Sequence, residues 1–98
     1  MKQFTTPKQT AKLIELRFEK PKSIVDHDGF WGYNYAYSIG ELIEMLPRNI
    51  GECPLIIHGS FIFEKWAVFY KGAKGFSRDE LIDALYEMVI KLKAEGVI

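Results

Sequence analysis

The most polar cluster in the sequence is Asp26-His27-Asp28, and a second histidine, His58, follows later in the chain. Carboxylates and imidazoles together can bind zinc or iron, or transfer protons as general acids and bases. The spacing of these four residues matches no metal-binding motif, and the cluster is also ordinary turn chemistry. A small metal-dependent hydrolase built on them is therefore an alternative only. We expect no catalytic residue, no bound metal and no cofactor.

Four aromatic side chains alternate along residues 31–37, which is typical of a strand with one aromatic face: Trp31, Tyr33, Tyr35 and Tyr37. Exposed aromatic rings on a sheet can stack the bases of single-stranded nucleic acids. Basic residues further along could flank that face: Lys65, Lys71, Lys74 and Arg78. These eight residues form the candidate binding surface. The interpretation that we favour is that the aromatic rings face helices and belong to the core.

A glycine-rich loop, Lys71-Gly72-Ala73-Lys74-Gly75, precedes the last predicted helix, where anions can bind. It does not have the spacing of a Walker A loop, and no Lys-Ser/Thr pair follows its last glycine. Asp79 and Glu80 already occupy the first turn of that helix, where they interact with the positive end of its dipole. The loop is expected to be solvated.

The composition predicts one globular domain over residues 1–98, because 48% of the 98 residues are hydrophobic. Cys53 stands alone, so no intramolecular disulfide can form, and we expect a cytoplasmic setting. No apolar run reaches the ~20 residues of a membrane span, and no signal peptide is evident. Thirteen basic residues balance thirteen acidic ones, whereas binders of double-stranded nucleic acid usually carry a basic excess.

Three helices are predicted, each by a capping box, in which a Ser or Thr cap and a Glu or Gln three residues later satisfy each other's amides. The first runs over residues 7–17 with Thr6 as its cap. The second begins after Ser38 and ends at Pro47. The third is expected to begin after Ser77, with Glu80 completing the box, and to end with Gly96 in a left-handed conformation.

Strands are predicted over residues 31–37, 55–58, 61–63 and 66–70, with a hairpin turn at Gly59-Ser60 and a loop over residues 19–32. The fold class that follows is α+β: a small antiparallel sheet of three or four strands packed against three helices, in the order α-β-α-β-β(-β)-α.

The last predicted helix is apolar around most of its circumference, with its polar stripe limited to Glu80, Asp83, Glu87, Lys91 and Ala94. A surface helix normally has an apolar face a little over ~100° wide. This helix must therefore be covered on more than one side. Either the sheet and the other helices cover it, or part of it is an interface with a second copy or a protein partner.

Four segments of the chain carry a resemblance: AKLIELRFEKP at residues 11–21, YSIGELIEMLP at 37–47, WAVFY at 66–70 and DALYEMVIKLKAEGVI at 83–98. In these segments the chain resembles a group of small uncharacterised proteins encoded by tailed phages, prophages and their anaerobic bacterial hosts. The resemblance supports the helix over residues 7–17. Arg17 departs from it, since the group often has glycine there, and this weakens the expected turn. The resemblance implies neither an activity nor site residues.

The leading hypothesis is a non-catalytic accessory protein of mobile-element origin that acts through an unknown protein partner or as a homo-oligomer. It rests on a small apolar-rich domain with well-capped helices and no polar constellation that matches a known site. A single-stranded nucleic-acid binder is the second hypothesis, and the metal-dependent hydrolase is the third.

Overall fold

Three helices and two antiparallel sheets make up the part of the chain that the computed structural model describes, residues 2–25, 34–60, 62, 64–73 and 75–98. The elements follow in the order α1 (Pro7–Glu15), β1 (Ser23–Val25), β2 (Asn34–Ala36), α2 (Ile39–Met45), β3 (Asn49–Ile50), β4 (Cys53–Ser60), β5 (Lys65–Tyr70), β6 (Phe76–Arg78) and α3 (Leu81–Ala94). One sheet has the order β3-β4-β5-β6, and the other pairs β1 with β2. The predicted α+β class is confirmed.

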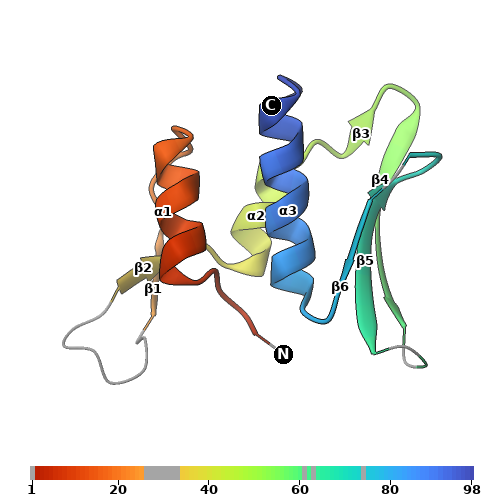
Figure 1. Cartoon of the computed structure of the whole chain (residues 1–98). Coiled ribbons are helices and arrows are strands. Elements are labelled where there is room, and N and C mark those ends of the chain that lie inside the picture. The colour runs from red at the N-terminus through yellow and green to blue at the C-terminus, as the bar shows by residue number, and fades with distance from the viewer. Residues whose placement is uncertain (1, 26–33, 61, 63, 74) are drawn as a thin grey trace.

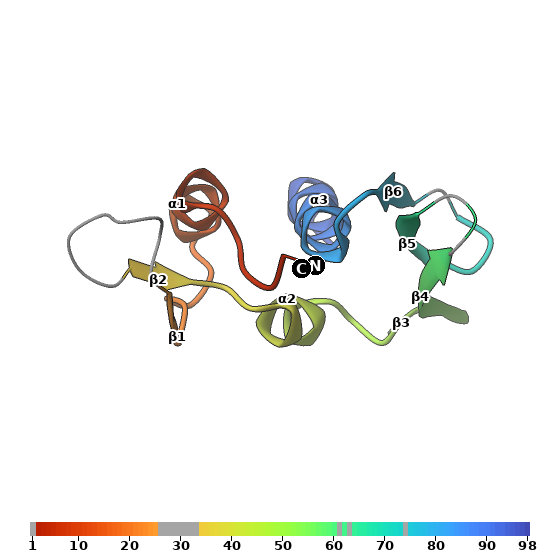
Figure 2. The same ribbon diagram turned by 90° about the horizontal axis from the view of Figure 1, so that it is seen from below.

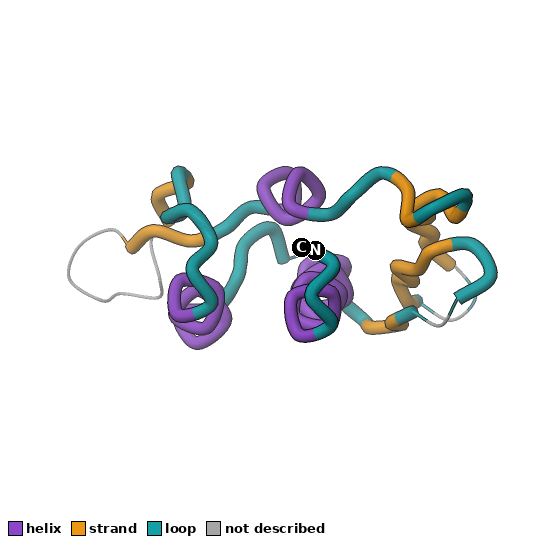
Figure 3. The backbone as a smooth tube through the Cα atoms, turned by 90° about the horizontal axis from the view of Figure 1, so that it is seen from above, coloured by secondary structure: helices purple, strands orange, loops and turns teal. Residues whose placement is uncertain are grey.

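The two sheets lie at opposite ends of a flat molecule, with α2 and α3 between them and α1 beside β1 and β2 (Figures 1, 2 and 3). Its principal extents are 45 × 34 × 17 Å. Helix α3 packs on β5 and β6 on one side and on α2 on another (Figure 2). Helix α1 stands at the far end with β1 and β2 (Figure 1). Helix α3 is therefore the element that connects the larger sheet to the other helices.

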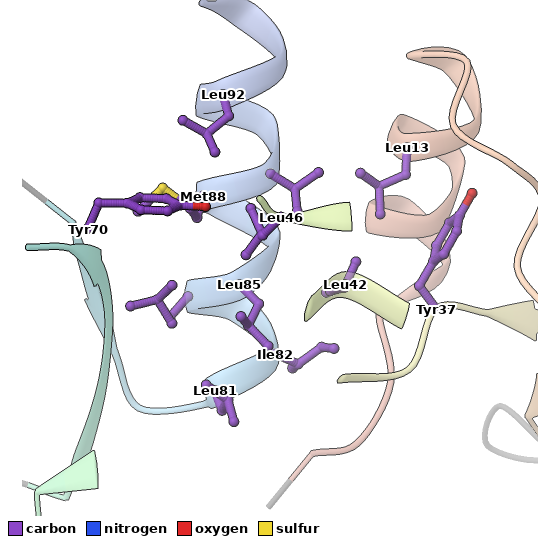
Figure 4. Close-up of a cluster of buried hydrophobic side chains, with 13 residues drawn as sticks. Leu13, Tyr37, Leu42, Leu46, Tyr70, Leu81, Ile82, Leu85, Met88 and Leu92 are labelled. Atoms are coloured by element: carbon purple, nitrogen blue, oxygen red, sulfur yellow. The ribbon is translucent and has the colours of Figure 1, made fainter. Parts of the chain in front are cut away.

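The core explains why α3 is apolar around so much of its surface. Seven of its side chains are buried: Leu81, Ile82, Ala84, Leu85, Met88, Val89 and Leu92. Figure 4 shows Leu85 and Met88 of this helix between Tyr70 from β5 on one side and Leu42 and Leu46, from α2 and its end, on the other. The chain itself thus covers most of this helix, and the breadth of its apolar surface gives no reason to invoke a second subunit.

Two of the predicted capping boxes are confirmed. At α1, the Gln9 amide donates to Thr6 Oγ1 at 3.1 Å, and the Thr6 amide donates to Gln9 Oε1 at 2.9 Å. At α2, Ser38 and Glu41 make the same reciprocal pair. Each box satisfies two backbone donors that a helix start would otherwise leave unpaired.

Helix α1 ends at Glu15, two residues before the predicted end. Arg17 follows with φ of 69°, and the Phe18 amide donates to the Leu13 carbonyl at 3.2 Å, which closes a Schellman-type ending. Glycine adopts this left-handed conformation without the clash that a Cβ causes. The turn therefore forms at the predicted place, with arginine in the position that glycine prefers.

Replacing Arg17 with glycine is expected to raise the free energy of unfolding by about 0.5–1 kcal/mol. Relief of the left-handed strain outweighs the extra backbone entropy that glycine adds to the unfolded chain. Urea denaturation followed by circular dichroism measures the change, with Arg17→Ala as the matched control. The alanine variant retains the Cβ and should show no such gain; equal stability of the two variants would contradict this account of the turn.

The predicted start of the last helix is wrong. Ser77 lies in β6, where it pairs with Ala67 of β5, and α3 begins at Leu81 after Glu80, which makes no side-chain capping bond. Strand pairing therefore takes the residues that a local capping box would have used. The predicted end is confirmed: Gly96 has φ of 75°, and the Val97 amide donates to the Leu92 carbonyl at 2.9 Å.

The predicted hairpin turn at Gly59-Ser60 is also wrong, because both residues belong to β4 and Ser60 pairs with Lys65. A Cβ at Gly59 would lie 3.1 Å from the ring of Trp66, its cross-strand partner. The glycine makes room for an aromatic ring rather than for a turn. Ile62 of the predicted strand over residues 61–63 lies in the turn instead, while Phe61 and Phe63 lie outside the described residues.

The loop predicted over residues 19–32 contains an unforeseen strand, β1, which pairs with β2. Within the strand predicted over residues 31–37, β2 covers Asn34–Ala36, and residues 31–33 lie outside the described part of the chain.

Candidate interaction site

The predicted aromatic surface is only partly present at the surface of the molecule. Tyr35 on β2 is 57% exposed, but Tyr37 is 1% exposed and belongs to the core. The Tyr37 hydroxyl donates a hydrogen bond to the Glu19 carbonyl. Burial, together with the nearby carboxylate of Glu41, raises the pKa of Tyr37. Tyr37 therefore cannot stack a base, and its place in the candidate binding surface is wrong. Its burial agrees with the favoured interpretation that the rings belong to the core, whereas the exposure of Tyr35 does not. Trp31 and Tyr33 lie outside the described residues.

The basic residues of that predicted surface do not gather around Tyr35. Lys65 begins β5 and Lys71 follows its end, at the opposite end of the molecule from β2 (Figure 1). Arg78 Nε lies 2.7 Å from a carboxylate oxygen of Glu87, and its guanidinium lies over the ring of Phe76. Lys74 lies outside the described residues. The described members thus do not form one nucleic-acid-binding face.

Most residues of the metal hypothesis lie outside the part of the chain that the structure describes. Asp26, His27 and Asp28 lie outside the described residues, and His58 is exposed on β4. Within the ranges that the structure describes, no group of three His, Cys, Asp or Glu side chains is placed to hold a metal ion.

The described surface has shallow depressions, of which two are considered as sites. One, of about 280 Å³, lies between α2 and the segment after α1, and it mixes both signs of charge through Lys20, Lys22, Glu41 and Glu44. The other, of about 480 Å³, lies at the end of the β4–β5 hairpin beside Trp66. Neither brings together the convergent polar groups that a specific small-molecule site needs.

The backbone of β4 offers a clearer feature. The Lys71 amide, just after β5, donates to the Pro54 carbonyl at 3.0 Å, so the carbonyl of Pro54 points to the β5 side of the strand. The Leu55 amide instead donates to the Arg48 carbonyl at 2.9 Å, on the opposite side of the strand. Because backbone groups alternate along an antiparallel strand, those of Ile57 and Gly59 also point away from β5.

No described strand meets those groups. Strand β3 pairs only with Cys53 and Pro54, and among the described elements β4 has no other neighbour on that side. We call this side of residues 56–60 the open edge of β4. Among the described strands it leaves unpaired two amides and two carbonyls, from Ile57 and Gly59, in the arrangement that an added strand would pair with.

The open edge lacks the protection that edge strands usually carry. In natural sheets, charged residues, proline, bulges or very short strands at the edge prevent pairing with another chain. Strand β6, at the other edge of the sheet, has three residues, with Arg78 as its last and Asp79 following. Strand β4 has eight residues, Cys53–Ser60, with no Lys, Arg, Asp or Glu, and its only proline, Pro54, precedes the open edge. One edge of the sheet, β6, is therefore short and ends in charged residues, whereas the other edge, β4, is long and uncharged.

The face of the sheet turned away from α3 adds apolar surface beside the open edge. Ile56 of β4 lies opposite Phe69 of β5, and both are half-buried outside the core cluster. His58 lies opposite Ala67 on the same face. None of the described helices covers this face (Figures 1 and 3).

Sequence reasoning missed the open edge because it placed a turn at Gly59-Ser60, which cut the strand short. The uncharged run Leu55-Ile56-Ile57-His58 was the available signal. Within the described residues, no helix has the length and hydropathy needed to cross a membrane. Comparison of the chain with protein-family models, curated proteins and solved structures finds no match.

Proposed function

We propose that this chain is a non-catalytic protein-interaction domain that binds a β-strand of a partner along the open edge of β4. The observation that carries the proposal is the set of four outward backbone groups of Ile57 and Gly59, on a strand with no charged residue. Strand addition to a sheet edge uses such main-chain groups for affinity and the alternating side chains for specificity. An accessory role is compatible with such a domain, and the resemblance implies a phage or prophage origin for it.

The energetics favour a partner strand that is itself extended and apolar. When a backbone group replaces a hydrogen bond to water with one to the partner strand, the net gain in binding free energy is only about 0.5–1.5 kcal/mol. Burial of apolar surface supplies the rest, at about 25 cal/mol per Å². Ile56 and Phe69 provide that surface on the face away from α3. Aliphatic residues at alternate positions of the partner would pack beside them.

Amide NMR titration with a short extended peptide tests the proposal. The probe carries the β4 sequence LIIHGS between lysine residues that keep it soluble, and its matched control has the same side chains with every backbone amide methylated. The unmodified peptide should shift the amide signals of Ile57 and Gly59 and leave Ser77, on the other edge strand, unchanged. The methylated peptide should shift none of the three, because it cannot donate to a strand edge. Shifts centred on Ser77, or none at all, would overturn the proposal.

A further inference from the structure

We infer that the strand that binds the open edge of β4 is β4 of a second copy of this chain, so that two copies join their larger sheets around a two-fold axis. This inference rests on the proposed strand-binding function and names its partner. Three features of β4 support it: the direction in which its backbone groups point, the position of β3 beside it, and the absence of charged residues.

The direction of the backbone amides and carbonyls along β4 limits how two β4 strands can pair. Outward groups come from Ile57 and Gly59, so a pairing that satisfies all of them sets Ile57 of each copy opposite Gly59 of the other. Four main-chain hydrogen bonds then form around the axis. His58 lies on the axis, opposite its own counterpart in a non-hydrogen-bonded pair, where Cβ atoms lie about 4.5–5.5 Å apart.

The position of β3 excludes the neighbouring register. A shift that sets Ile57 opposite Ile57 would require Gly59 of one copy to lie against Leu55 of the other. The outward amide of Leu55 already donates to the Arg48 carbonyl at 2.9 Å, so it cannot pair with Gly59 of a second copy. The segment of chain that leads into β3 therefore blocks that register, whereas the pairing through His58 satisfies every outward group of Ile57 and Gly59 with partners inside β4.

Charge favours a second copy as the occupant. Across the paired residues, 56–60, the strand has no Lys, Arg, Asp or Glu, so self-pairing brings no like charges of these residues together. The formal net charge of the chain is zero with neutral histidines, so two copies do not repel each other at long range. Ile62, which is 86% exposed just beyond the paired strand, would come close to the beginning of β4 in the second copy.

Sedimentation velocity as a function of concentration tests the inference. The contact is small, so we expect a dissociation constant on the order of tens of micromolar. His58→Asp should weaken association at least about tenfold, because two carboxylates would face each other across the axis. Ser77→Asp is the matched control: Ser77 and His58 flank Ala67 on the same face, from β6 and β4 respectively. It should leave association unchanged.

Charge reversal gives the sharpest outcome. His58→Lys should also dissociate the pair, whereas an equimolar mixture of His58→Asp and His58→Lys chains should associate again, because opposite charges then meet. Circular dichroism checks that each variant is folded. Wild-type association that His58→Asp and His58→Lys leave intact, or that Ser77→Asp abolishes, would overturn the inference.

The peptide titration separates this inference from the proposed function. A chain that stays monomeric up to ~1 mM, well above the expected dissociation constant, but binds the β4 peptide at Ile57 and Gly59 would refute self-pairing and leave strand binding standing. A monomer that also fails to bind the peptide would refute both.

Discussion

Replacing Leu85 with alanine is expected to lower the free energy of unfolding by about 2–5 kcal/mol. Leu85 is completely buried on α3, within the cluster that brings together α2, α3 and β5 (Figure 4). Removing its side-chain atoms loses their burial and leaves a cavity that surrounding helix and sheet cannot fully close. Domains of this kind are stable by only about 5–15 kcal/mol in total. The loss should therefore be a large part of the total stability.

Urea denaturation followed by circular dichroism measures this loss. Ile14→Ala is the control, because Ile14 also lies on a helix but is 41% exposed. It should cost much less, since surface substitutions usually change stability by under ~0.5 kcal/mol. If the two variants lost the same stability, α3 would not be the centre of the core, and the packing described here would be incorrect.

Gly75→Ala is expected to destabilise the chain by about 3 kcal/mol. A Cβ at this position would lie 2.2 Å from the Val68 carbonyl oxygen, 2.3 Å from Phe69 Cβ and 2.8 Å from Phe69 Cα. Two of these are backbone atoms, so no rotation of a flexible side chain can relieve the clash. The chain would have to shift just before β6, at the point where β6 begins to pair with β5.

Gly40→Ala is the matched glycine substitution. Gly40 lies in α2, and its added Cβ would meet only Ser38 Oγ, at 3.8 Å. Alanine is the better helix former, so this variant should gain up to ~1 kcal/mol. Thermal or urea unfolding of the two variants should thus give changes of opposite sign. Similar stability of Gly75→Ala and the wild type would contradict the close approach of residue 75 to β5.

The helix ends were the most predictable part of this fold, because their signals are local. Thr6 with Gln9 and Ser38 with Glu41 satisfy backbone amides within one turn, whatever lies elsewhere in the chain. Gly96 likewise ends α3 through its own conformation. At these three helix ends both partners of the interaction lie within a short stretch of sequence, and the prediction was correct.

Ser77 and Gly59 show where local signals fail. Ser77 with Glu80 has the same spacing as the two capping boxes that form. Ser77 nevertheless lies in β6, where it pairs with β5 and does not cap a helix. Gly59-Ser60 has the composition of a hairpin turn, yet the ring of Trp66, seven residues later, needs the space above Gly59. Both outcomes depend on a strand distant from the signal, so local propensity could not decide them.

The candidate site was less predictable than the fold. Tyr35 and Tyr37 belong to one alternating pattern, but one is exposed and the other is buried against α1 and α2. The open edge of β4 depends on how far β3 extends, since β3 covers two residues and leaves the rest unpaired among the described strands. The length of a neighbouring strand is a property of the assembled sheet and has no counterpart in the composition of β4 itself.

Hydrogen–deuterium exchange of four amides along β4 tests the central claim most directly. In a dilute sample, the amides of Ile56 and His58, which face β5, should exchange slowly, and those of Ile57 and Gly59 should exchange rapidly. Raising the chain concentration, or adding the β4 peptide, should protect Ile57 and Gly59 as well. If both amides were already protected in the dilute monomer, another part of the chain would cover the edge, and the interaction site proposed here would not exist.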